Sequence, residues 1–119
     1  MADVTIYHNP RCSKSRQTLA LLKSKGVDVD IVEYLKSPPD FKTLESLLQK
    51  LELEPRELMR SREDEYRRLE LSAVTDRREL IEAMVKHPIL IERPIVIKGD
   101  KARLGRPPEQ VLEILGLNP

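Results

Sequence analysis

The sequence predicts a single α/β domain: a mixed four-stranded sheet with helices on both faces and a helical insertion of about residues 38–90. Three observations lead to this fold class. The 119 residues suit one hydrophobic core. Short β-branched runs near both ends of the chain are typical of buried strands, and segments with helical periodicity separate those runs. The expected order is strand–helix–strand, several helices, then strand–strand–helix.

The first three elements are predicted to form a βαβ unit. Residues 4–7 are β-branched or aromatic and favour a strand. Apolar residues then recur at helical spacing up to Gly26, a residue that readily adopts the left-handed conformation ending many helices. Alternation over residues 27–34 predicts the second strand. Because a helix joins the two strands, they should be parallel neighbours with a right-handed crossover.

The middle of the chain is predicted to be helical. Ser37 can act as an N-cap, Pro38 suits the first helical position, and Asp40 lies three residues after the cap. This pattern predicts a helix that begins after Ser37 and runs to about Leu51.

A second short helix is expected over residues 56–60, followed by a charge-dense run at 61–68 that we interpret mainly as solvated surface. Asp76 with Glu79 then predicts another capped helix. That helix should end near His87, which precedes a proline.

The last part of the chain returns to strands. Residues 95–97 and 102–104 flank a turn that contains Gly99, which predicts a hairpin. The prolines at 107–108 should open a final helix that Gly116 closes. This order of elements is that of a thioredoxin-like sheet with a helical insertion.

Cys12, the only cysteine, lies at the turn between the first strand and the first helix. Pro10 cannot continue a sheet ladder and disfavours helical dihedrals in the residue before it, so the helix should begin at or just after Cys12. The free N–H groups there, together with Arg11 and Lys14, favour an anion. The alternative is a structural thiol packed in the core. The polar neighbours favour a reactive thiolate.

Two side chains near Cys12 are candidate catalytic groups. Ser15 stands one helical turn further on, where its hydroxyl can donate a hydrogen bond to the sulfur or simply bond the backbone. His8 can either pair with the thiolate or hold the loop.

The pattern His8-Asn9-Pro-x-Cys12-x-x-Ser15-Arg16, with Thr18-Leu19, resembles the signature of the glutaredoxin-coupled arsenate reductase family. The resemblance extends over nearly the whole chain through Arg60, the run Arg93-Pro94-Ile95-Val96 and the run Gly105-Arg106-Pro107. It implies the thioredoxin-like fold and a hydrogen bond from Ser15 to the sulfur. It further implies that Arg60, Arg93 and Arg106 hold an arsenic oxyanion, a role that suits forked guanidinium donors. A cis peptide bond before Pro94 is expected with this fold.

The activity implied by the resemblance is the reduction of arsenate to arsenite. Cys12 would attack arsenate, glutathione would then reduce the arsenic, and glutaredoxin would clear the glutathione-bound intermediate. One alternative is a glutathione-dependent thiol oxidoreductase with little arsenate activity. Another is a non-enzymatic redox regulator that binds RNA polymerase, which Ser15 disfavours because it replaces a second cysteine. Cysteine phosphatases carry an arginine six residues after the cysteine, where this chain has Thr18, so phosphate ester hydrolysis is not expected.

Composition limits the cofactors and partners. A single cysteine cannot form an internal disulfide and must take reducing equivalents from outside. One cysteine and two histidines make no plausible zinc site, and no glycine-rich phosphate loop is present. We therefore expect no metal and no tightly bound cofactor, with glutathione acting as a co-substrate.

Charge and hydropathy limit the setting. The net charge of +1 gives no reason to expect a nucleic-acid or acidic-membrane partner. Residues 1–3 lack the character of a signal peptide, and no apolar run approaches membrane length. We expect a monomer in the reducing cytoplasm.

Overall fold

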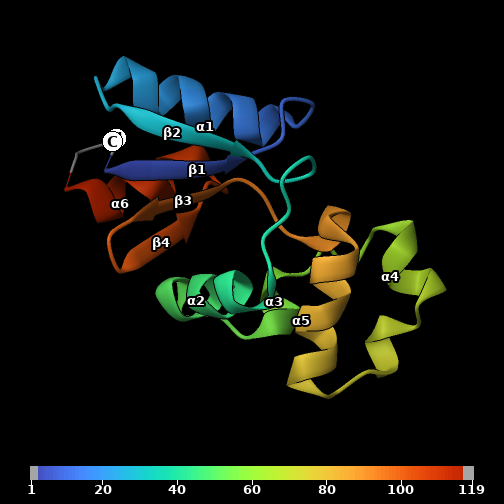
Figure 1. Ribbon diagram of the computed structural model, residues 1–119. Helices are drawn as coiled ribbons and strands as arrows, with labels where there is room; N and C mark the ends of the chain where they lie inside the picture. Colours follow the sequence, from blue (N-terminus) through green and yellow to red (C-terminus); the bar gives the residue numbers. More distant parts are fainter. Residues whose placement is uncertain (1–2, 117–119) are drawn as a thin grey trace. The chain divides into compact units, whose positions relative to one another are not determined.

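The computed structural model describes residues 3–116, which fall into two units (Figure 1). Unit 1 combines residues 3–37 with residues 93–116, and unit 2 consists of residues 38–92. The predicted insertion of about residues 38–90 lies within the bounds of unit 2. Whether the whole chain acts as one domain stays a prediction.

Unit 1 is built on a four-stranded sheet in the order β2-β1-β3-β4. The strands are β1 (Val4–His8), β2 (Val29–Glu33), β3 (Ile95–Lys98) and β4 (Lys101–Leu104). β1 pairs in parallel with β2, as predicted, and both β1–β3 and β3–β4 are antiparallel. The mixed thioredoxin-like sheet is confirmed. Its two edge strands are β2 and β4.

The helices of unit 1 are α1 (Ser13–Ser24), the 3-10 turn η3 (Pro108–Val111) and α6 (Leu112–Leu115). Val4 and Ile6 of β1 pack with Leu22 of α1 and Val111 of η3 in one buried cluster. Alternate residues of a strand share one face, so this cluster marks the sheet face covered by α1 and η3. Gly26 has φ +73°, and α1 ends just before it as predicted.

Unit 2 is helical, as predicted. Its elements are α2 (Phe41–Leu51), α3 (Pro55–Leu58), α4 (Asp64–Arg68), η1 (Leu71–Ala73), α5 (Arg77–Lys86) and η2 (Pro88–Leu90). Leu44 and Leu48 of α2, together with Ile81 and Met84 of α5, are among its fully buried side chains. The predicted cap of α5 is confirmed, because the Asp76 carboxylate accepts a hydrogen bond from the Arg78 backbone N–H at 2.9 Å.

The predicted start of α2 is wrong. The helix begins at Phe41, and its N-cap is Asp40, whose carboxylate accepts from the Thr43 backbone N–H at 2.8 Å. A residue that precedes a proline is pushed toward extended dihedrals. Two consecutive prolines at 38–39 therefore keep Ser37 from acting as the cap and delay the helix until after them.

The short helix α3 also ends earlier than predicted, at Leu58 rather than Arg60. Met59 is extended, with ψ 144°, and forms an antiparallel bridge with Ile91. The pairing of these two segments takes Arg60 out of the helix. Among residues 3–116, no helix has the length and apolar character needed to cross a membrane.

Candidate functional site

Cys12 is the residue at which the loop after β1 becomes helix α1. Its backbone is extended, with φ −93° and ψ 124°, and it occupies the N-cap position. The Cys12 N–H donates to the Asn9 carbonyl at 3.0 Å, and the Cys12 carbonyl accepts from the Arg16 N–H at 3.0 Å. The thiol is partly exposed. The sulfur is therefore carried at the N-terminus of a three-turn helix, where an anion is favoured.

The surroundings of Cys12 favour its thiolate. Burial alone raises the pKa of the thiol. The Ser15 backbone N–H, the Arg93 side chain by hydrogen bonding and by charge, and the Lys14 backbone N–H all lower it, and the pKa lies below its ordinary value. Lys14 acts on the thiol through its backbone N–H. This set of donors favours the thiolate over the thiol.

Ser15 acts on Cys12 through its backbone N–H, and its hydroxyl bonds the Asn9 backbone, one of the two roles considered for it. The fully buried hydroxyl accepts a hydrogen bond from the Asn9 N–H at 3.0 Å and is 2.6 Å from His8 Nδ1. The Ser15 contribution that lowers the pKa of the thiol comes from its N–H.

His8 ties the end of β1 to the first turn of α1 through Ser15. Burial lowers the pKa of the imidazole; Glu33 opposes this, and the charges of Arg16 and Lys23 add to it. The lowered pKa favours neutral imidazole at pH 7. Of the two roles considered for His8, holding the loop fits this geometry better than an ion pair with the thiolate.

Asn9 is a buried loop residue whose importance the sequence reading missed. Its side-chain oxygen accepts from the Arg11 N–H at 3.0 Å, and its carbonyl accepts from the Cys12 N–H. With the bond from its own N–H to Ser15, Asn9 shapes the turn that presents Cys12. The Asn-Pro dipeptide is a turn signal and could have identified this role.

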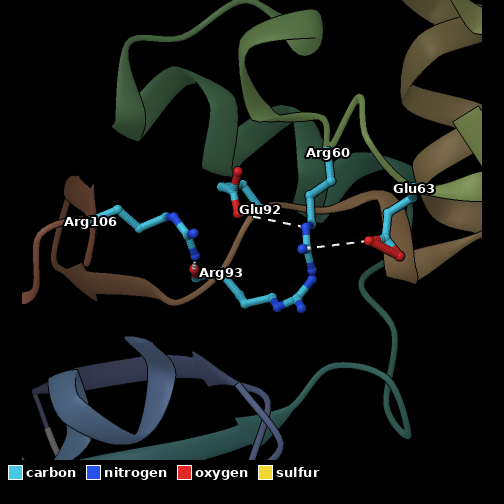
Figure 2. A network of polar contacts seen from close by, with 5 residues as sticks. All are labelled: Arg60, Glu63, Glu92, Arg93 and Arg106. Atoms are coloured by element: carbon cyan, nitrogen blue, oxygen red, sulfur yellow. Dashed lines mark hydrogen bonds and ion pairs between the residues drawn. The ribbon is translucent and has the colours of Figure 1, made fainter. Parts of the chain in front are cut away.

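Arg93 and Arg106 lie on adjacent loops of unit 1. Arg93 contacts the Cys12 thiol through its side chain. Arg106 Nη1 donates to the Arg93 carbonyl at 3.0 Å, and Figure 2 shows its side chain reaching that backbone. The Arg93–Pro94 bond, expected to be cis, is cis in the structure, and so is Arg106–Pro107. The structure thus joins these two predicted arginines to each other and Arg93 to the sulfur.

Gly105 allows the two loops to pack closely against α1. A Cβ atom at this position would lie 2.4 Å from Thr18 Oγ1 and 2.7 Å from Pro94 Cγ. The Gly105 N–H also donates to the Pro94 carbonyl at 3.0 Å. A side chain here would push apart the segments that carry Arg93 and Arg106.

Arg60, the third predicted arginine, belongs to unit 2. Its guanidinium lies between two carboxylates, with Nη2 at 3.5 Å from Glu63 Oε2 and Nε at 3.8 Å from Glu92 Oε1 (Figure 2). The sequence reading treated Glu63 as part of a solvated run. The i,i+3 spacing of Arg60 and Glu63 is the signal that could have paired them.

A pocket of about 330 Å³ lies beside the Cys12 loop, between it and the segment that follows β2. Its lining includes Arg11 from the loop and Glu33, Leu35 and Lys36 from the end of β2 and beyond. Lys36 Nζ is 3.5 Å from Glu33 Oε1. The pocket offers charges of both signs and an apolar wall to a small molecule. The described part of the chain holds no cluster of three His, Cys, Asp or Glu side chains suited to a metal ion.

Comparison with known proteins points to one family. A profile of the ArsC family matches residues 7–114. The chain is 57% identical over 116 residues to "Uncharacterized protein YfgD" of Escherichia coli, covering 96% of this chain and 98% of that protein. It is 50% identical over 115 residues to "Arsenate reductase" of Haemophilus influenzae, covering 95% and 99% of the two chains. A solved structure, "Arsenate reductase from Vibrio cholerae", superposes with TM-score 0.91 at 50% identity, covering 93% and 96%.

Proposed function

Because the chain belongs to the ArsC family, we propose that it is an arsenate reductase that uses Cys12 as its single nucleophilic cysteine. One observation carries the proposal. Burial raises the pKa of the Cys12 thiol, but hydrogen bonds from the Ser15 and Lys14 backbone and from Arg93 lower it below its ordinary value. A thiolate at a helix N-terminus can attack an electrophile without a separate base.

In the proposed reaction, the Cys12 thiolate attacks arsenic(V) and one arsenate oxygen leaves as water. A glutathione thiol displaces a second oxygen, again as water. A glutaredoxin thiolate then attacks the glutathione sulfur, and the sulfur–arsenic electron pair stays on arsenic, which becomes arsenic(III). Glutathione leaves as a mixed disulfide with glutaredoxin. Hydrolysis of the remaining sulfur–arsenic bond releases arsenite and regenerates Cys12.

The arginines supply the proposed binding of the oxyanion. Arg93 already contacts the sulfur, and Arg106 is bonded to the Arg93 carbonyl. A guanidinium stays charged and presents forked donors suited to a tetrahedral oxyanion, and the free N–H groups at the start of α1 add to the attraction. Arg60 is assigned to the same task by family resemblance, and its role stays a prediction.

Glutathione and glutaredoxin are proposed as the reductants because the chain has one cysteine and cannot close a disulfide of its own. The pocket beside the Cys12 loop is the proposed binding site for a small thiol peptide such as glutathione. Arg11 and Lys36 would donate hydrogen bonds to the two carboxylates of glutathione, and Glu33 would accept from its ammonium group. A monomer in the reducing cytoplasm remains our expectation.

The test is arsenite formation from arsenate, glutathione and glutaredoxin, with the native chain compared with Cys12→Ser. The native chain should form arsenite, and the variant should be at the blank rate, a loss of at least about 10³-fold, because the attacking atom is gone. Omitting glutaredoxin should stop turnover of the native enzyme. No arsenite above blank from the native chain would overturn the proposal.

A second candidate is a glutathione-dependent thiol oxidoreductase with little arsenate activity. The observation that favours it is the pair of carboxylates beside Arg60, which offset the charge that an arsenate clamp needs. Reduction of a glutathionylated peptide by the native chain, without arsenite formation in the assay above, would select this candidate.

A further inference from the structure

Arg60 and Glu92 are brought together by backbone pairing within unit 2. The Arg60 N–H donates to the Leu90 carbonyl at 2.7 Å, and the Glu92 N–H donates to the Leu58 carbonyl at 2.8 Å. These two bonds flank the bridge between Met59 and Ile91. In such an antiparallel pair, Arg60 and Glu92 are diagonal neighbours on one face, within reach of long side chains.

Glu63 reaches the same guanidinium from the turn before α4. Its N–H donates to the Arg60 carbonyl at 3.2 Å, which closes a tight turn and brings the two side chains together. The side chains of Arg60, Glu63 and Glu92 are 22%, 25% and 22% exposed, so water reaches all three partly. Figure 2 shows both carboxylates beside the guanidinium.

The two contacts are ion pairs rather than close hydrogen bonds. The nitrogen–oxygen distances of 3.5 Å and 3.8 Å exceed the 2.7–3.2 Å typical of N–H···O bonds. Arg60 Nη1 is buried and has no hydrogen-bond partner. The guanidinium therefore retains donor capacity that a bound anion could satisfy better than the present arrangement does.

The carboxylates beside Arg60 oppose the binding of an anion to its guanidinium. One guanidinium faces two carboxylates, so an oxyanion that approaches Arg60 is repelled by Glu63 and Glu92 as well as attracted by the guanidinium. The repulsion grows with the charge of the anion, so a dianion is penalised more than a monoanion of similar shape.

We propose that Glu63 and Glu92 are specificity residues: they occupy Arg60 while no anion is bound, and an incoming tetrahedral oxyanion must compete with them for its guanidinium. The inference rests on the proposed role of Arg60 in oxyanion binding. It assigns to this chain a weaker hold on dianions than its arginines alone would provide, and a relative preference for oxyanions of low charge.

The experiment is a titration of the full chain with sulfate and with perchlorate, two tetrahedral anions of charge −2 and −1, at constant ionic strength. Binding is followed by NMR at the Arg60 Nε–Hε signal, which is assigned by its loss in Arg60→Gln. The chains are native, Glu63→Gln, Glu92→Gln and the double variant. Glu45→Gln is the matched control, because it removes a carboxylate that pairs with Arg77 at 3.1 Å elsewhere in unit 2.

The double variant should bind sulfate about 3- to 10-fold more tightly than the native chain, with a smaller gain for perchlorate. Each single variant should gain part of this, and Glu45→Gln should gain nothing. In an Arg60→Gln background, followed by backbone amide signals, the gain should disappear. Thermal melting shows whether each variant is folded.

Weaker sulfate binding in the double variant would overturn the proposal, because the carboxylates would then orient Arg60 rather than compete for it. An equal gain in Glu45→Gln, a gain that persists without Arg60, or no measurable binding in any chain would also overturn it. The titration measures anion affinity, whereas the reductase assay measures arsenite formation. Failure of the reductase and failure of this inference are therefore seen separately.

Discussion

Two arginines with the same chemistry contact different kinds of group in this protein. In unit 1, Arg93 contacts a thiol and favours its ionisation. In unit 2, Arg60 lies beside the carboxylates of Glu63 and Glu92. The first arginine favours a negative charge on the sulfur, whereas the second is flanked by two acidic side chains. A guanidinium in a candidate anion site therefore cannot be counted as free positive charge until its neighbours are known.

The two regions also differ in how their polar groups are satisfied. Around Cys12, the buried side chains of His8, Asn9 and Ser15 form hydrogen bonds of 2.6–3.0 Å. Around Arg60, the ion pairs are longer and partly exposed to water. Removing a partner should thus be costly to folding in the first region. It should affect anion affinity more than stability in the second.

The largest effect should separate the two arginines. Arg93→Gln removes a hydrogen bond and a positive charge from Cys12, so the pKa of the thiol should rise, and arsenite formation should fall about 10²- to 10³-fold. The rate of Cys12 alkylation against pH should show its midpoint displaced upward. Arg60→Gln is the matched variant, and its alkylation midpoint should stay at the native value. Equal displacement in both variants would contradict the contrast between them.

Ser15→Ala should destabilise unit 1 by about 1–3 kcal/mol, because it leaves the buried Asn9 N–H and His8 ring nitrogen without their shared partner. Urea unfolding followed by circular dichroism measures the change. Ser24→Ala is the control: its hydroxyl bonds the Leu21 carbonyl at an exposed site, and the loss should be within about 0.5 kcal/mol. If Ser15→Ala unfolds at the same urea concentration as Ser24→Ala, the buried network does not stabilise the loop.

The smallest effect should come from the exposed cap of α2 in unit 2. Asp40→Ala should lower the melting temperature, whereas Ser37→Ala should leave it unchanged, since Asp40 accepts the bond from Thr43. That bond lowers the pKa of the Asp40 carboxyl. The carboxylate is favoured in the folded state, so the cap is fully effective above the ordinary pKa of aspartate and is lost as pH falls through the lowered value. The difference in melting temperature between native and Asp40→Ala should accordingly vanish in acid.

Local patterns were enough to predict most elements, the Asp76 cap and the position of Cys12 at the start of a helix. Each depends on residues within one or two turns of one another, such as Pro10 before Cys12 or Gly26 after α1. Errors arose where local signals competed. Ser37 looked like a cap, but the two prolines after it delay the helix to Asp40.

The sequence by itself determined which segments form the main strands and helices, apart from their exact ends, and that Cys12 lies at a helix start, because these follow from short-range dihedral preferences and periodicity. Only the tertiary structure decided which groups act on one another. Arg93 meets Cys12, and Glu92 meets Arg60, through the pairing of segments far apart in the chain. Thr18 and Pro94 enclose Gly105 for the same reason. A charge or hydrogen bond acts over a few ångströms of space, and separation along the chain does not reveal which distant residues folding will bring that close.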